Sequence, residues 1–321
     1  MSLANLARRL GACCLLWAIA SPAATAQVTR VVVPSPPGGF ADIAVRLIAE
    51  RLQKELGGSV IIEHKPGAGG TVGLDYLRNA RPDGGTVGMI NLSATANETI
   101  NVRKTFSILA DFEPVGHYAW LANILIVNPR QTAGDLAAYV SVLKQRANTD
   151  YSSGGVGSPG HLASEVFRSR IGAKLTHIPY KGAPPAVTAV VSGEVAFMFA
   201  TASSAIAQVK GERVRALAVT TPERLRQLPE VPTLAEAGLA DFNITDWVGL
   251  VAPKGTPAET RERLHTAFAA AFADAPTRER LRDATIHATQ KPLGPAEFGA
   301  FLRADVDKWA KVVREANITQ E

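Results

Sequence analysis

The chain has 321 residues and a formal net charge of +5, with 34 lysines and arginines against 29 acidic residues. The excess of positive charge is spread along the chain, without the basic block or basic-aromatic stripe that nucleic-acid binding requires. The sequence therefore argues against a nucleic-acid partner. This mild basicity suits a protein with a small anionic ligand.

Residues 1–26 are predicted to be a cleaved signal peptide, so the protein is expected in the periplasm. Arg8 and Arg9 form a positively charged n-region, and residues 10–20 form an apolar stretch too short to span a bilayer. Ala24 and Ala26 are the small residues of a cleavage site, which predicts a mature chain beginning at residue 27.

Both cysteines, Cys13 and Cys14, lie within this segment. The mature chain therefore has no thiol for a disulfide, a metal site or a nucleophile. A lipoprotein cleavage box at Cys13 is a weak alternative, because no apolar run precedes it. The remaining roughly 295 residues are enough for a well-packed core and about two lobes.

The first predicted unit of the mature chain is a strand, a turn and a helix. Residues 30–33 are a β-branched strand, and an apolar stripe from Ile43 to Leu56 predicts an amphipathic helix. Between them, Gly38 and Gly39 leave the backbone open to a ligand. The free N–H groups of the first helical turn favour an anion. Asp42 is expected to cap this turn, and an ordinary strand-to-helix turn is the alternative.

Two more strands end in loops of small residues. Residues 60–62 are followed by a Gly-rich turn over residues 64–73, and residues 86–90 are followed by a loop over residues 91–95. The βαβαβ order predicts a parallel sheet with these loops together at its carboxyl edge. Open α/β sheets bind ligands at that edge.

The same organisation is predicted to recur in a second lobe. A strand end and small-residue loop over residues 150–161 leads into a helix, and further strands are expected over residues 175–180, 195–199 and 214–220. A crossing strand at 242–252 and three closing helices at 257–273, 276–284 and 295–316 are expected to return to the first lobe. The predicted division is lobe 1 over residues 27–127 and 247–321, and lobe 2 over residues 128–246.

The sequence lacks the motifs of several enzyme classes, because the required residues are absent or wrongly spaced. Val72 occupies the third glycine position of a G-x-G-x-x-G motif, no Gly-Lys-Ser/Thr is present, and Val156 excludes a nucleophile elbow at Ser158. The six histidines form no closely spaced ligand pair. A hydrolase that uses Ser158 and His161 lacks the third, orienting group.

The sequence allows more than one role for several side chains. His161 either lines the cleft or caps its own loop. Ser153 and Ser158 are anion donors by type, but plain turn residues look the same. Lys181 is expected to be solvated, and Trp247 is expected to lie in the core.

Seven co-linear motifs carry a family resemblance, and they span nearly the whole mature chain. They are Pro34-x-Pro-Pro-Gly-Gly-x-x-Asp42, Lys65-Pro-Gly-Ala-Gly-Gly70, Asp111-Phe-x-Pro-Val115, Ser153-x-Gly-x-Gly-Ser-x-x-His161, Pro179-Tyr-Lys-Gly182, Leu228-Pro-x-Val-Pro-Thr-x-x-Glu-Ala-Gly238 and Trp247-x-Gly-x-x-Ala-Pro253. The chain resembles the substrate-binding proteins of tripartite tricarboxylate transporters, also called Bug-type receptors.

The resemblance implies an α/β, two-lobed, type II periplasmic-binding fold with the ligand cleft between the lobes. It implies a monomeric receptor for a small organic carboxylate, without catalysis, cofactor or metal, that delivers its ligand to membrane permease subunits. Backbone N–H groups and small hydroxyls of the strand-to-helix loops are expected to hold the carboxylate. Carried over by position, the contacts are Ser35, Pro37, Gly38, Gly39, Phe40, Ala68, Gly69, Gly70, Thr71, Ser93, Ser153, Gly155, Gly157, Ser158, His161, Tyr180, Ala200 and Thr201.

Three residues depart from the family pattern. Ser35 replaces an aromatic residue beside the cleft, which alters the expected pocket wall, and Gly85 replaces a common aromatic. Ala200 stands where an aspartate is frequent, which is expected to favour a plain carboxylate over an amino acid. A sensing subunit that reports to a sensor kinase binds its ligand in the same way, so the residues do not separate it from a transport receptor.

Overall fold

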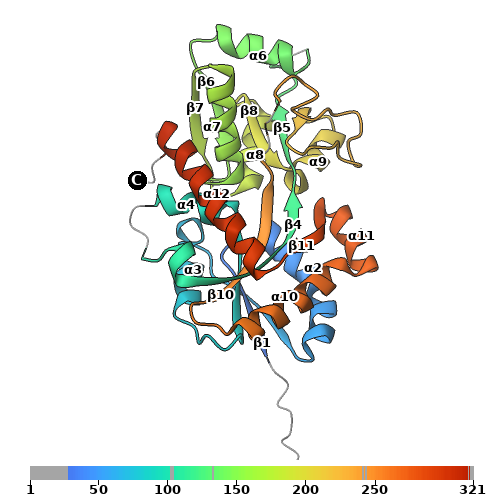
Figure 1. Ribbon diagram of the computed structural model, residues 1–321. Coiled ribbons are helices and arrows are strands. Elements are labelled where there is room, and N and C mark those ends of the chain that lie inside the picture. Colours follow the sequence, from blue (N-terminus) through green and yellow to red (C-terminus); the bar gives the residue numbers. More distant parts are fainter. Residues whose placement is uncertain are drawn as a thin grey trace, which may run out of the picture.

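The computed structural model describes residues 28–101, 105–131, 134–240, 242, 244–316 and 318 (Figure 1). The predicted signal peptide and its cleavage site lie outside these ranges. Across the described residues, every helix is too short or too polar to cross a membrane.

One sheet joins strands from both ends of the chain, in the order β11-β4-β10-β3-β1-β2. Its strands are β1 (Thr29–Val33), β2 (Val60–His64), β3 (Thr86–Asn91), β4 (Phe112–Leu121), β10 (Asp246–Pro253) and β11 (Ile286–Leu293). Strands β1, β2 and β3 pair in parallel, as the βαβαβ order predicted. Strand β10 pairs antiparallel with β3 and β4, and β11 pairs antiparallel with β4, so the complete sheet is mixed.

The second sheet has the order β7-β6-β8-β5-β9. Its strands are β5 (Asn123–Val127), β6 (Thr149–Ser153), β7 (Leu175–Pro179), β8 (Phe197–Thr201) and β9 (Arg215–Val219). Strand β5 belongs to this sheet, although the sequence analysis placed residues 123–127 in lobe 1, because the chain passes from one sheet to the other at Ala122. The chain therefore first passes from lobe 1 to lobe 2 near residue 122 and not after residue 127.

Helices follow most strands and cover the sheets (Figure 1). Their bounds are α2 (Phe40–Leu56), a 3₁₀ turn η1 (Ala68–Gly70), α3 (Thr71–Arg78), α4 (Leu92–Ile100), α5 (Ile108–Asp111), α6 (Leu136–Gln145), α7 (Pro159–Ile171), α8 (Ala183–Ser192), α9 (Ala202–Lys210), α10 (Ala258–Ala273), α11 (Ala275–Asp283) and α12 (Pro295–Glu315). Helix α4 corrects one expectation: residues 92–95 form its first turn and not a loop. Gly57 ends α2 in a left-handed conformation.

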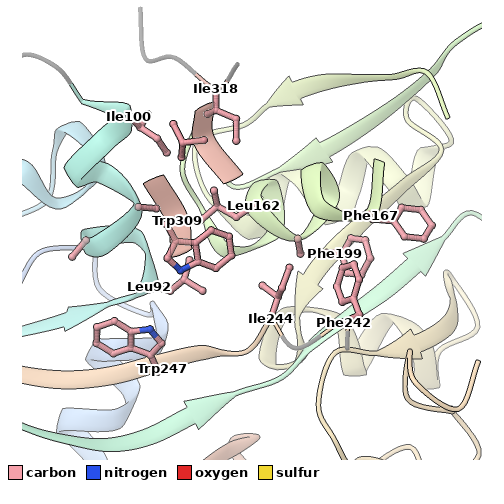
Figure 2. Close-up of a cluster of buried hydrophobic side chains, with 14 of the residues drawn as sticks. Leu92, Ile100, Leu162, Phe167, Phe199, Phe242, Ile244, Trp247, Trp309 and Ile318 are labelled. Carbon is pink, nitrogen blue, oxygen red and sulfur yellow. The ribbon is translucent and has the colours of Figure 1, made fainter. Parts of the chain in front are cut away.

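A hydrophobic cluster continues from the first sheet to the second along α12. In Figure 2, the indole of Trp309 on α12 lies between Leu92 of α4 and Leu162 of α7, and Phe167 and Phe199 lie farther along the same cluster. Trp309 and Leu162 are fully buried. The last helix therefore packs mainly on the first half, as expected, and its C-terminal end also contacts the second, where Arg168 Nη2 donates to the carbonyl oxygen of Ala316.

Candidate functional site

A cavity of about 280 Å³ lies where loops from both sheets meet. The first sheet contributes the turns after β1 and β2 and the start of α4, and the second sheet contributes the loop between β6 and α7. This is the predicted carboxyl edge of β1, β2, β3 and β6. The lining residues are Pro34, Ser35, Pro36, Ala41, Pro66, Gly67, Gly69, Gly70, Leu74, Met89, Ile90, Asn91, Ser93, Ala94, Asn97, Gly154, Val156, Gly157 and Ser158.

The polar character of this cavity comes from backbone groups and neutral side chains. None of its described lining residues is ionisable. The residues that precede α3, α4 and α7 (Gly70, Asn91 and Ser158) all line it, so three helix N-termini meet at one cavity. Free N–H groups and the positive ends of helix dipoles favour a negative charge at such a place.

One hydroxyl in the cavity wall lacks a partner. Ser35 Oγ is buried and makes no hydrogen bond within the described part of the chain. A buried hydroxyl normally finds a partner, so this one is available to a polar ligand. The neighbouring wall is apolar, with Leu74, Ile90 and Val156 able to contact a carbon skeleton.

Asn97 joins the two halves of the cavity. Its Nδ2 donates to the carbonyl oxygen of Gly69 at 2.9 Å, and its side chain also faces Gly157 from the second sheet. A Cβ on Gly157 would lie 2.9 Å from Asn97 Oδ1, so only glycine fits without displacement. The sequence analysis missed Asn97, because nothing in its local pattern within α4 distinguishes it from a surface residue.

Asp42 lies beside the cavity wall but does not line it. Its Oδ2 accepts from the N–H of Gly38 at 2.8 Å, and its Oδ1 lies 2.7 Å from both Arg46 Nε and His64 Nε2. Burial raises the pKa of the Asp42 carboxyl, but the hydrogen bonds from Gly38, His64 and Arg46 outweigh it and leave the pKa lowered. The negative charge is thus neutralised within the turn, which fits a structural role and not a ligand contact. Asp42 is not the helix cap that was expected, because it lies inside α2 and Gly39 occupies the N-cap position without a side-chain cap.

In the second half, serine and histidine side chains build the loop that faces the cavity. His161 Nδ1 accepts from the N–H of Gly157 at 3.1 Å, so this histidine caps its own loop. Ser153 Oγ is buried 2.6 Å from His177 Nε2. The rings of His161 and His177 stack with centroids 3.8 Å apart. Ser158 accepts from the N–H of His161 at the start of α7.

Six residues of the predicted contact set line the cavity: Ser35, Gly69, Gly70, Ser93, Gly157 and Ser158. The others lie nearby or elsewhere. Pro37 and Gly38 are exposed, Phe40 packs on the core of the first sheet, and Tyr180 Oη donates to Glu194. Among the residues whose side chains the structure describes, those outside the lining set are Pro37, Gly38, Gly39, Phe40, Thr71, Ser153, Gly155, His161, Tyr180, Ala200 and Thr201.

The expectation for Ala200 needs a correction. Ala200 is fully buried in the core of the second sheet, where it pairs with Ile124 of β5. It lies within β8 and not at the cleft mouth, because that strand continues to Thr201. The absence of an aspartate at this position therefore does not explain ligand preference.

The stacked histidines predict an acid-sensitive loop. Burial lowers the pKa of His161 to about 4 and that of His177 to about 3. Below the usual histidine pKa of 6.5 the unfolded chain therefore binds protons that the folded chain does not. As the pH falls from about 6.5 to 4, each histidine should lower the free energy of unfolding by up to about 1.4 kcal/mol per pH unit.

The measurement is a set of urea titrations at several pH values on the wild type and His177→Gln. Asp246 acts oppositely, because burial raises its pKa to about 7, so only the difference between the two proteins isolates the histidine. The stability of the wild type relative to His177→Gln should fall as the pH drops from 6.5 towards 4. A difference independent of pH would contradict the prediction.

Comparisons with known proteins agree with this geometry. The family model described as "Tripartite tricarboxylate transporter family receptor" matches residues 44–318. Protein BugT of Bordetella pertussis is 31% identical over 293 residues, covering 90% of this chain and 89% of BugT. The structure of R. palustris Rpa4515 with adipate is similar with a TM-score of 0.82 and 29% identity, covering 91% of this chain and 97% of that one.

A second solved structure is MatC from Rhodopseudomonas palustris with bound malate. It has a TM-score of 0.79 and 28% identity, and the match covers 89% of this chain and 98% of MatC. These similarities confirm the expected α/β, two-lobed periplasmic-binding fold. The family consists of transport receptors and not of enzymes. The chain belongs to the tripartite tricarboxylate transporter receptor family of periplasmic solute-binding proteins.

Proposed function

We propose that this protein captures a small organic carboxylate in the cavity between its lobes and delivers it to a membrane transporter of the tripartite tricarboxylate type. The observation that carries the proposal is the cavity itself. Three helix N-termini meet there, and none of its described lining residues is ionisable. The malate and adipate held by two similar receptors support the same ligand class.

In this proposal the ligand bridges the two lobes. One carboxylate accepts from backbone N–H groups near Gly70 and Asn91 and from Ser35 Oγ, and the apolar wall contacts the carbon chain. The loop before Ser158 closes over the other end of the ligand. Hinged closure of this kind sequesters the ligand, and the closed form is the one presented to the permease.

The test is calorimetric titration and thermal shift of the protein from residue 27 onward with adipate, malate and adipamide. Adipamide matches adipate in length but carries no charge. We expect at least one dicarboxylate to bind and to stabilise the protein by about 2.7 kcal/mol at a hundredfold excess over its dissociation constant. Binding of adipamide as tight as that of adipate would contradict an anion receptor.

Delivery needs a separate measurement. Reconstituted uptake with a cognate permease should require this protein, and the same permease without it should not move the ligand. A ligand-loaded receptor that activates a sensor kinase but supports no uptake would instead favour the sensing role.

A further inference from the structure

A second, larger cavity of about 1270 Å³ lies at the outer side of the first sheet. It shares none of its described lining residues with the first cavity. Strands β4 and β11 and helix α11, which lie together in Figure 1, form most of its wall. Pro222 and Glu223, which follow the last strand of the second sheet, form the opposite rim.

The floor of this cavity is a row of aromatic rings. Trp247, Trp120 and His287 occupy paired positions on β10, β4 and β11. The rings of Trp120 and His287 are stacked, with centroids 4.1 Å apart and an interplanar angle of 7°. His117 and Trp120 are only half-buried although they lie in a sheet. Because Trp120 and His287 cover one face of each other, another planar ring can contact this pair only at its edges or on an outer face.

Polar groups without partners surround this floor. His287 Nε2 and Arg282 Nε are buried and make no hydrogen bond within the described residues. In the same part of the chain, the Arg278 guanidinium has no hydrogen bond or ion pair and is half-buried at the cavity wall. Buried polar nitrogens such as His287 Nε2 and Arg282 Nε are rarely left unpaired, so a polar partner for them is expected in the cavity.

The charges at the wall favour one orientation of a ligand. Arg282 and Glu279, which both line the cavity, form an ion pair and so largely cancel. Arg278 then remains as the cation on the α11 side. Glu223 is an exposed acid on the opposite rim, where solvent screens it.

We propose that this cavity is an accessory binding site for a planar aromatic carboxylate, whose ring packs against the stacked pair of Trp120 and His287 and whose carboxylate pairs with Arg278. The arrangement combines an aromatic cluster with a guanidinium fork that matches a carboxylate in two hydrogen bonds. The ligand lies between the first sheet and the Pro222–Glu223 rim, and it does not enter the cavity that faces Gly157.

The probe is benzoate, added to ¹⁵N-labelled protein from residue 27 onward while the indole N–H signals are followed by NMR. Trp120→Phe assigns the Trp120 signal. Benzoate should shift that signal in a saturable way. Cyclohexanecarboxylate has the charge without the flat ring, and benzamide has the ring without the charge, so both should bind at least about tenfold more weakly.

Variants give the decisive comparison. Arg278→Gln should weaken benzoate binding by about tenfold or more, because it removes one charge-assisted pair. Arg303→Gln removes the same charge from an exposed position on α12 outside the lining set and should leave benzoate affinity unchanged. Circular dichroism establishes that both variants are folded.

Two results would overturn the proposal. One is a Trp120 signal that does not move up to the solubility limit of benzoate. The other is a shift that survives Arg278→Gln unchanged, or that disappears equally with Arg303→Gln, because the carboxylate would then not be held at α11.

Discussion

Replacing Trp309 with alanine is expected to lower the free energy of unfolding by about 3–5 kcal/mol, the range for deletion of a buried large aromatic side chain. Trp309 is fully buried on α12, between Leu92 and Leu162 (Figure 2). Because this helix packs on both halves of the molecule, the cavity left by the indole weakens the contact between them. Urea denaturation followed by circular dichroism measures the change.

A polar contact contributes to this loss. Trp309 Nε1 donates to Asp305 Oδ1 at 3.2 Å, and Asp305 Oδ2 accepts from Thr95 Oγ1 at 2.6 Å and from Trp247 Nε1 at 3.3 Å. Burial raises the pKa of Asp305, and these hydrogen bonds oppose the increase. Loss of the indole N–H leaves a buried carboxyl with fewer donors, which costs about 1–3 kcal/mol.

Trp309→Phe separates the two contributions. Phenylalanine keeps most of the buried ring but has no N–H, so its loss should be about 1–3 kcal/mol and clearly smaller than that of alanine. Equal losses for both variants would assign the effect to the hydrogen bond alone. A loss below about 1 kcal/mol for Trp309→Ala would show that α12 does not hold the halves together.

The elements next to the cavity could be predicted because local signals specify them. A β-branched run, a glycine-rich turn and an amphipathic helix are recognisable without tertiary information, and this pattern identified the turns around Gly38 and Gly70. Strand β11 was missed because it is an edge strand whose sequence, with His287, Gln290 and Lys291, lacks apolar alternation. Its place depends on pairing with β4.

The composition of the cavity wall was harder to predict for the same reason. Gly157 was identified from its loop, but its partner Asn97 lies in the interior of a helix and is selected only by the meeting of two lobes. Ala200 was misplaced because a motif position was taken as a cleft position, whereas the register with Ile124 buries it. Sequence periodicity shows which face of a helix or strand is buried, whereas contacts between the lobes depend on the strands that connect them.

The contact between Gly157 and Asn97 gives the largest expected effect on binding. Gly157→Ala should weaken binding of the cavity ligand, measured with adipate, by about 10- to 100-fold, which corresponds to about 1.4–2.8 kcal/mol. The backbone φ of Gly157 is +74°, and an added Cβ would lie 2.9 Å from Asn97 Oδ1 and 3.2 Å from Ile100 Cδ1. The methyl group therefore keeps the loop of the second sheet away from α4 and opposes closure over the ligand.

Gly172→Ala is the matched control for backbone strain. Gly172 ends α7 with φ of +66°, and nothing lies within 4 Å of the position that an alanine methyl group would take, so alanine there has the strain without the steric clash. Its expected cost is about 1–2 kcal/mol of stability with unchanged adipate affinity. Calorimetry on both variants, with small-angle scattering to compare the ligand-loaded shapes, separates the causes. If Gly157→Ala binds adipate as tightly as the wild type does, closure at Asn97 is not part of binding; if both variants lose affinity alike, strain and not the clash is responsible.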